Sequence, residues 1–210
     1  MLLNIKKSFS KYRMKVRGVV EVGAHWGQEY EAYYRRGVKH FIFIEPCRPA
    51  WQKLLGRLDG KDGVDGIINC ACGDFTGEAD MFTGPTNEGM SNSLLKPKVH
   101  LTQHPDVLFN STEKVKMEML DNIPFDRNNY NLLSMDCQGF EDRVLRGAVE
   151  TLKTIDYIYT EVNREFMYED CALVEVLDKL VPDFTRVETR WASERHGWGD
   201  SLYIRKSLLR

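Results

Sequence analysis

The sequence predicts an α/β fold with a doubly wound, mostly parallel sheet that ends in a C-terminal antiparallel hairpin. Apolar runs alternate with amphipathic stretches along most of the 210 residues, which is typical of strands and helices that follow one another in a parallel sheet. Most of these runs are almost continuously apolar, as expected where both faces of a sheet are covered. The last third differs, because two strand-like runs there have no helix between them.

Each predicted element has a local signal. Gly37 is suited to end the first helix, and Pro49 is suited to begin the second, where proline is favoured. A glycine-rich loop, 196–200, separates the two strands of the hairpin. The predicted strands of the main sheet are 19–22, 41–44, 67–70, 130–135 and 155–162, the helices are 28–36, 49–58, 140–152 and 170–180, and the hairpin strands are 184–191 and 201–205.

We expect one domain, 1–210, with a basic leader segment, 1–16, that forms a solvated helix. The segment 82–110 is long, polar and rich in glycine and proline, so we predict that it is a lid or substrate loop. The net charge of −2 favours neither nucleic acid nor an acidic membrane. No apolar stretch is long enough for a membrane span, and the five cysteines, an odd number, indicate free thiols in a reducing, cytoplasmic location.

The stretch VVEVGAHWG, 19–27, is the first candidate site, because it is a short apolar strand followed by two glycines. Gly23 would allow a sharp turn, and Gly27 would allow close approach of a ligand or of the next helix. A dinucleotide fingerprint would need a glycine where His25 stands, so we predict a nucleoside site without a diphosphate, which disfavours a nicotinamide oxidoreductase. Alternatively, His25 and Trp26 cap the helix and pack on the sheet.

Two acidic residues fit the same ligand. Glu45 follows the second strand, 22 positions after Gly23, where an acidic residue can accept the hydroxyl protons of a ribose, and Pro46 stiffens the turn behind it. Glu21 would repel a diphosphate but suits a cationic amino-acid group. Together these features predict S-adenosylmethionine as the cofactor. The remaining predicted cofactor contacts are Ala24, His25, Ala71 beside the adenine, and Asn92 and Ser93 from the loop.

A second candidate site lies in the stretch NLLSMDCQGFEDRVLRGA, 131–148. A strand there ends in Asp136, Gly139 makes a turn, and an amphipathic helix follows. Asp136 would lie at the carboxyl edge of a central strand, beside Gly23, and is predicted to contact the cofactor; a helix cap or loop anchor is the alternative.

These motifs resemble the FkbM-type S-adenosylmethionine-dependent methyltransferases, over roughly residues 19–204. The family usually has Glu where Gln138 stands and often Asp where Glu21 stands. The resemblance implies a seven-stranded class I methyltransferase fold and methylation of hydroxyl groups, often on sugars or sugar-bearing natural products. The matching stretches are VEVGAHWG at 20–27, IEP at 44–46, LSMDCQGFE at 133–141 with LRGA at 145–148, EVN at 161–163 and GDSLY at 199–203.

A hydroxyl acceptor is a poor nucleophile, so a base or a metal should help to remove its proton. Asp136 is the first candidate base, and Glu161 and Asn163 lie on one face of the next strand. These three oxygen donors could hold Mg²⁺, although we favour a hydrogen-bond network instead. His196 is a second candidate base, or else a surface histidine. Trp191, Trp198, Tyr168 and Phe166 could form an apolar wall for a sugar.

We therefore predict an O-methyltransferase acting on a small-molecule or glycan acceptor. An N- or carboxyl-methyltransferase would use the same cofactor site, and a non-catalytic cofactor- or glycan-binding module is a further alternative. The sequence leaves open the oligomeric state and membership of a larger multidomain enzyme.

Overall fold

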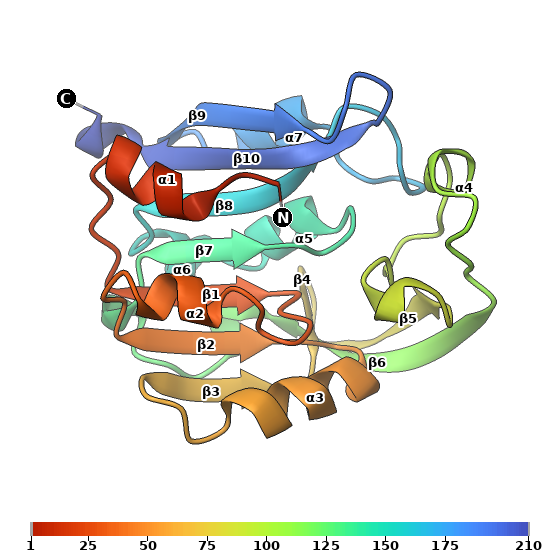
Figure 1. The fold of residues 1–210 in the computed structure, drawn as a ribbon, viewed down its shortest axis with the longest axis horizontal. Helices are drawn as coiled ribbons and strands as arrows, with labels where there is room; N and C mark the ends of the chain where they lie inside the picture. The colour runs from red at the N-terminus through yellow and green to blue at the C-terminus, as the bar shows by residue number, and fades with distance from the viewer. Residues whose placement is uncertain (1, 210) are drawn as a thin grey trace.

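The computed structural model describes residues 2–209 and contains a seven-stranded sheet with helices on both faces (Figure 1). The strand order is β3-β2-β1-β7-β8-β10-β9. β1 (Gly18–Val22) lies in the middle and pairs in parallel with β2 (His40–Ile44) and β7 (Leu132–Met135). β3 (Val64–Ile68) and β8 (Tyr157–Asn163) continue the parallel pairing on the two sides. The predicted doubly wound, mostly parallel sheet is confirmed.

The C-terminal hairpin is also confirmed, with one shifted boundary. β10 pairs antiparallel with both β8 and β9 (Phe184–Trp191). It spans Trp198–Arg205, so most of the glycine-rich loop predicted at 196–200 is strand instead. Asp200 consequently lies inside the sheet, opposite Glu161 of β8, and both side chains are buried.

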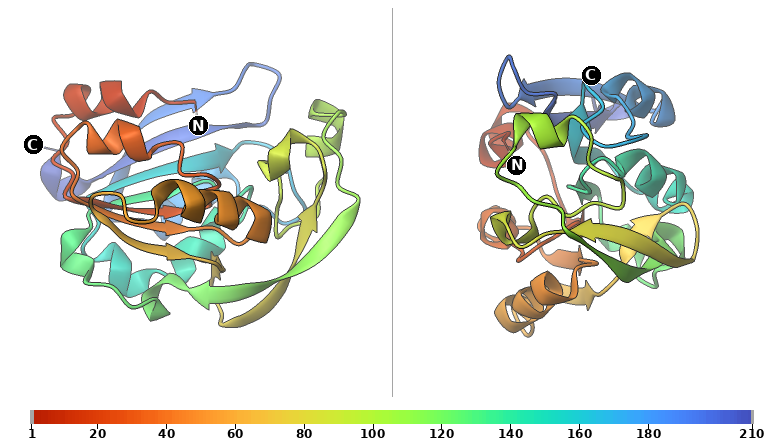
Figure 2. Two further views of the ribbon diagram at one scale, coloured as in Figure 1. Left: turned by 60° about the horizontal axis from the view of Figure 1, so that its bottom comes forward. Right: turned by 90° about the vertical axis from the view of Figure 1, so that its right-hand side faces the viewer.

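Successive residues of the central strands pack into different cores. Val20, Val22 and Ile44 join the cluster under α5, whereas Val19 and Phe43 join the cluster under α1, α2 and α3. This explains the continuous apolar runs, because each strand buries both of its faces. Figure 2 shows the two layers of helices on opposite sides of the sheet. The helices of one layer are α1 (Ile5–Lys11), α2 (Tyr30–Tyr34) and α3 (Arg48–Leu58); those of the other are α5 (Glu141–Arg146), α6 (Val149–Leu152) and α7 (Val174–Leu180).

We had expected the leader segment to form a solvated helix, but the structure shows that one face of it is buried. Ile5 and Phe9, one helical turn apart in α1, are buried in the core above the sheet together with Leu3 and Met14. The chain before α1 is held too, because the amides of Leu2 and Leu3 donate to the carboxylate of Asp200. The apolar i, i+4 spacing therefore outweighs the basic composition of this segment.

A small three-stranded sheet, in the order β4-β6-β5, was not predicted. β5 (Gly77–Thr83) and β6 (Ser111–Met119) form an antiparallel hairpin, and β4 (Ala71–Gly73) pairs with β6 in parallel. The residues between the hairpin strands, 84–110, form most of the predicted loop 82–110 and include α4 (His100–Gln103) and the 3-10 turn η1 (Asn87–Gly89). We call 84–110 the hairpin loop; it lies beyond the carboxyl ends of the main strands (Figure 2).

The remaining 3-10 turns are η2 (Leu120–Asn122), η3 (Arg127–Asn129) and η4 (Lys206–Leu208). None of the helices between residues 2 and 209 has the length and apolar character that a membrane crossing requires.

Candidate active site

A cavity of about 320 Å³ opens where β1, β2 and β7 end, and we call it the first cavity. Its floor is the turn after β1, which depends on glycine. Gly23 has φ +76°, and a Cβ atom there would lie 2.0 Å from the carbonyl oxygen of Asp136. Only glycine therefore lets the end of β1 pass this close to the end of β7.

Gly27 lies where the chain packs against α3. It has φ +66°, and a Cβ atom there would lie 2.4 Å from Cδ1 of Leu58 in α3. Gly27 thus allows the chain to pack on a helix, and it does not line the first cavity. Of the two readings of this glycine, the structure supports close helix packing.

Glu45 lies at the wall of the first cavity and also anchors its turns. Its two carboxylate oxygens accept hydrogen bonds from the backbone amides of His25 (2.7 Å) and Cys47 (2.8 Å). Each oxygen keeps a further lone pair that can accept from a ligand. Burial raises the pKa of Glu45 to about 7, and the two amide hydrogen bonds oppose that rise.

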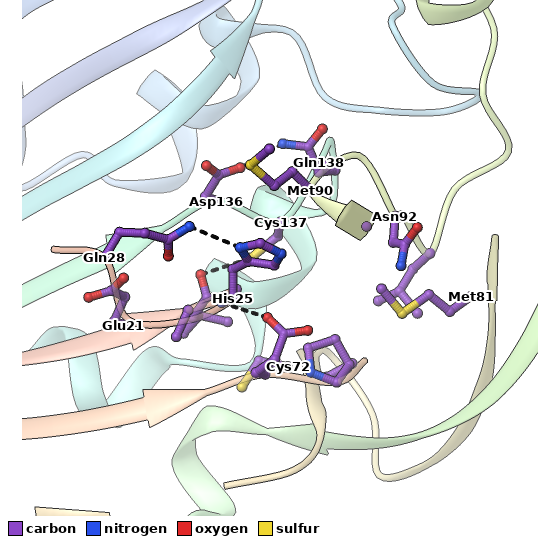
Figure 3. Close-up of a pocket in the computed structure, with 18 of the residues that line it drawn as sticks. Glu21, His25, Gln28, Cys72, Met81, Met90, Asn92, Asp136, Cys137 and Gln138 are labelled. Carbon is purple, nitrogen blue, oxygen red and sulfur yellow. Dashed lines mark hydrogen bonds between the residues drawn. The ribbon is translucent and has the colours of Figure 1, made fainter. Parts of the chain in front are cut away.

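His25 connects the floor of the first cavity to the hairpin loop. Its Nε2 atom lies 3.0 Å from the carbonyl oxygen of Glu88, and its Nδ1 atom lies 2.9 Å from the side-chain nitrogen of Gln28. The ring stacks on Trp26 with centroids 4.5 Å apart. Figure 3 shows His25 in the centre of the view, with Gln28 reaching toward it.

The first cavity is acidic. Four carboxylates line it, and no lysine or arginine between residues 2 and 209 does so; the four are Glu21, Glu29, Glu45 and Asp136. The Oε2 atom of Glu21 is buried without a hydrogen-bond partner among the described residues, and burial raises the pKa of this carboxyl well above its usual range. Glu21 and Asp136 lie at one end of the cavity, and Met81 and Asn92 lie at the other (Figure 3).

The hairpin loop contributes to the first cavity, but not with every expected residue. Asn92 lines it, and its amide contacts the sulfur of Cys47 at 3.6 Å. Ser93 instead donates to the carbonyl oxygen of Gln138 at 2.8 Å and lines neither cavity. The other predicted contacts at the wall are Gly23, Ala24, Pro46 and Ala71.

A second cavity of about 220 Å³ adjoins the first, and both are lined by Met90, Asp136 and Gln138. Its outer wall comes from the hairpin loop through His100 and His104. The rest of its lining comes from Glu161 of β8, Trp198 of β10 and the segment with Met167 and Tyr168. Asp136 therefore faces both cavities from the end of β7.

Gln138 joins the two carboxylates of the second cavity. Its Nε2 atom donates to Asp136 Oδ1 at 2.6 Å and to Glu161 Oε2 at 3.1 Å. The hydroxyl of Tyr168, 2.7 Å from Gln138 Oε1, fixes the amide in this orientation. Burial raises the pKa of Asp136 and raises that of Glu161 further.

The expected magnesium ligands do not form a metal site. The Gln138 amide lies between the Asp136 and Glu161 carboxylates, where a bridging cation would have to sit. Asn163 is buried but lines neither cavity. Within the described chain, no group of three or more His, Cys, Asp or Glu side chains is arranged to hold a metal ion. Asp136 and Glu161 share a hydrogen-bond network through Gln138, whereas the side-chain atoms of Asn163 have no hydrogen-bond partner among the described residues.

Of the other residues predicted to act on or contact the methyl acceptor, only some line the second cavity. Trp198 and Tyr168 line the second cavity, whereas Trp191 and Phe166 do not. His196 lies behind the wall: its ring stacks on His104 at 5.1 Å, and its Nδ1 atom lies 2.6 Å from the hydroxyl of Ser193.

Sequence reasoning missed the apolar and amide groups that complete the two cavities. Met81 comes from β5, which we had not predicted. Gln28 belonged to a predicted helix, and His104 lay in the loop with no motif around it. The glycine turns and strand-end acids could be found from short patterns, but no short pattern marked these residues.

The comparisons with known proteins agree with this architecture. Residues 21–194 match the family described as "Methyltransferase FkbM domain". The 2-O-methyltransferase NoeI of Sinorhizobium fredii is 32% identical over 178 residues, which cover 80% of this chain and 72% of that protein.

Solved structures share the fold at low identity. One is Sp1610 of Streptococcus pneumoniae, a tRNA (m1A22) methyltransferase candidate in complex with S-adenosyl-L-methionine. Its TM-score is 0.54 at 11% identity, and the match covers 98% of this chain and 73% of Sp1610. Magnesium protoporphyrin IX methyltransferase (ChlM) of Synechocystis, with bound cofactor, has a TM-score of 0.51 at 6% identity over 96% of this chain and 75% of its own. The resemblance noted in the sequence is confirmed: the chain belongs to the FkbM family of S-adenosylmethionine-dependent methyltransferases.

Proposed function

We propose that this protein is an O-methyltransferase that moves a methyl group from S-adenosylmethionine to a hydroxyl of a sugar or glycan. The observation that carries the cofactor assignment is the charge of the first cavity: four carboxylates line it, with no lysine or arginine between residues 2 and 209. Such a wall suits a ligand with a positive sulfur and an ammonium group. It disfavours a dinucleotide, whose diphosphate needs positive or amide partners.

The cavity also suggests an orientation for the cofactor. Glu21 has a buried carboxylate oxygen without a partner in the described chain, and we assign it to the ammonium end. Glu45, with acceptor capacity left on both oxygens, is assigned to the ribose hydroxyls. Met81 and Asn92 lie toward the opposite end (Figure 3), and we assign them, with Ala71 of the same lining, to the adenine. Gly23, Ala24, His25 and Pro46 complete the proposed contacts, while Gly27 and Ser93 would act only by holding the walls.

Bound S-adenosylmethionine would supply an electrophilic methyl group, and the residues at the junction of the two cavities would do the rest. Asp136 faces both cavities, so we assign it as the group that takes the acceptor's hydroxyl proton. Its raised pKa makes it a stronger base than an exposed aspartate. Glu161 and Gln138 hold it in place, and alignment of acceptor with donor would contribute further rate enhancement.

O-methylation is favoured by the relationship to NoeI, which is described as a 2-O-methyltransferase. An N- or carboxyl-methyltransferase remains the alternative, as does a module that binds without catalysis. His196 is a weaker candidate for the base because it lies behind His104. A single catalytic domain, a lid role for the hairpin loop and a cytoplasmic location stay predictions.

Two measurements test the proposal. Calorimetric titration should show binding of S-adenosylmethionine and none of NADH. A panel of glycosides, amines and carboxylic acids is then incubated with the labelled cofactor, with and without a chelator, and the products are identified by mass spectrometry and NMR. We expect an ether on a sugar hydroxyl, formed equally in both conditions. Binding of NADH, or methylation of nitrogen or carboxylate alone, would contradict it.

A further inference from the structure

We infer that the second cavity binds an uncharged sugar ring and excludes anionic sugars. This inference rests on the proposed function, because that proposal places the methyl donor in the first cavity. The two cavities meet at Met90, Asp136 and Gln138, so a ring in the second cavity would present a hydroxyl to the Asp136 carboxylate. The argument below concerns what the walls of this cavity accept.

The walls contain a continuous row of aromatic rings. Trp198 lies 6.4 Å from His104, His104 lies 4.8 Å from His100, and His100 lies 5.4 Å from Tyr168, measured between ring centroids. Aromatic faces carry partial negative charge, and the C–H faces of a sugar ring are weakly positive. Four rings beside one small cavity therefore favour a flat ligand with an apolar face and polar edges.

The cavity has no cation to receive an anionic ligand. Among residues 2–209, no lysine or arginine lines it. Burial lowers the pKa of His100 to about 4, and burial followed by the neighbouring His196 lowers that of His104. Both rings are therefore neutral near pH 7, and Asp136 and Glu161 line the same cavity. A phosphate or carboxylate placed here would lose its hydration without gaining an opposite charge.

The carboxylates of the cavity are already partly satisfied. Each accepts one hydrogen bond from the Gln138 amide, at 2.6 Å and 3.1 Å, and Tyr168 fixes that amide from behind. Their remaining lone pairs suit the modest donors of neutral hydroxyls. The polar groups on the loop side, Asn87 and Ser91, are neutral as well. Every wall of the cavity therefore matches an uncharged polyol.

The four tryptophans of the chain allow a direct test by ¹⁵N-indole NMR. Trp198 lines the second cavity, and Trp26 stacks on His25 beside the first cavity. Trp51 lines neither cavity, and its indole N–H is directed to the carbonyl of Ile67 at 3.5 Å. S-adenosylhomocysteine should shift the Trp26 signal. Neutral methyl glycosides of glucose, N-acetylglucosamine and fucose, titrated with and without S-adenosylhomocysteine, should shift the signal of Trp198 and leave that of Trp51 unchanged.

Glucuronate and glucose 6-phosphate serve as anionic probes. The inference predicts no shift of Trp198 with either of them at concentrations where at least one neutral glycoside shifts it. His104→Ala should weaken binding of that glycoside by about tenfold, a loss equivalent to about 1.4 kcal/mol. His40→Ala, which changes a histidine paired with Asp65 at the far end of β2, is the matched control and should leave binding unchanged.

The outcomes separate the two proposals. A shift of Trp26 by S-adenosylhomocysteine without any glycoside shift of Trp198 overturns the sugar inference and leaves the cofactor assignment standing. A stronger response to an anionic probe, or an equal loss in His104→Ala and His40→Ala, also overturns it. Absence of any response to S-adenosylhomocysteine contradicts the proposed function, and the glycoside titration of the unliganded protein still decides the sugar inference.

Discussion

The two cavities meet at Asp136 but are built in different ways. The first cavity forms mainly where β1, β2 and β7 end, and two of its acids, Glu45 and Asp136, directly follow β2 and β7. The second cavity combines the hairpin loop with β8, β10 and residues 167–168, which are far apart in the chain. The first is thus a property of the parallel sheet itself, and the second is a property of what this chain adds to the sheet. Changes in the two regions should affect different steps.

The largest expected effect comes from the residue that the cavities share. Asp136→Asn keeps the shape of the side chain but removes the carboxylate that we assign as base. We expect kcat to fall by about 100-fold or more, the range of general base catalysis, while the Kd for S-adenosylmethionine rises by less than about tenfold. Single-turnover rates and calorimetry measure the two quantities. A variant with wild-type kcat would remove Asp136 from the chemistry.

A change confined to the first cavity should affect binding of the cofactor. Glu45→Ala removes a carboxylate that accepts amide hydrogen bonds from His25 and Cys47, and with it the proposed ribose contact. We expect the Kd for S-adenosylmethionine to rise by about 10- to 100-fold, equivalent to the loss of one or two charged hydrogen bonds. Glu169→Ala, an exposed change, is the control in calorimetry. Unchanged affinity would show that the ribose lies elsewhere.

A buried glutamate of α5, the helix behind the junction of the two cavities, should make the stability of the protein depend on pH. Burial raises the pKa of Glu141 to about 7, while its Oε1 atom accepts the amides of Cys137 and Gly139. Because the folded form holds this proton more tightly than the unfolded form, the stabilisation is complete below about pH 4.5 and is lost as the pH rises through about 7.

Glu141→Gln keeps the accepting oxygen and removes the titration. The free energy of unfolding of the variant, relative to that of wild type, should therefore rise by on the order of 2 kcal/mol from pH 5 to pH 8. Urea denaturation measures this difference. The exposed change Glu150→Gln should show no such difference. If Glu141→Gln raised the free energy of unfolding equally at pH 5 and at pH 8, titration of Glu141 would be ruled out as the cause.

The smallest expected effect is at the outer wall of the second cavity. His196 only stacks on His104 and does not line either cavity. His196→Ala should change kcat/KM by less than about threefold, far below the loss expected for a general base. A fall comparable with that of Asp136→Asn would mean that His196 reaches the acceptor when it is bound.

The sequence predicted the sheet and the first cavity better than the second. Continuous apolar strands revealed the parallel core, and Gly23, Glu45 and Asp136 could be recognised because each follows a strand directly. β6 was not predicted, because charged residues such as Lys114 and Lys116 surround its buried Val115 and Met117. Trp198 was placed in a loop since its glycine neighbour suggested a turn, whereas pairing with β8 extends the strand.

Two of the contacts of Gln138 depend on tertiary structure. Its amide reaches Glu161 on another strand and Tyr168 beyond that strand, and no spacing in the chain encodes those distances. The row of aromatic rings also depends on tertiary structure, because it forms where the end of α4 meets β10. Short motifs thus identified where a ligand would bind, but the selectivity of the second cavity required the folded chain.

The attachment of the first residues has a practical consequence for handling this protein. Leu2 and Leu3 bind Asp200, Tyr159 binds the Leu3 carbonyl at 3.0 Å, and Asp200 lies opposite Glu161 in the sheet. We expect an affinity tag fused ahead of Leu2 to strain this attachment and disturb the strand that carries Glu161. η4, near the other end of the chain, lies away from the carboxyl ends of the main strands (Figure 1), so a tag at that end should leave this attachment intact.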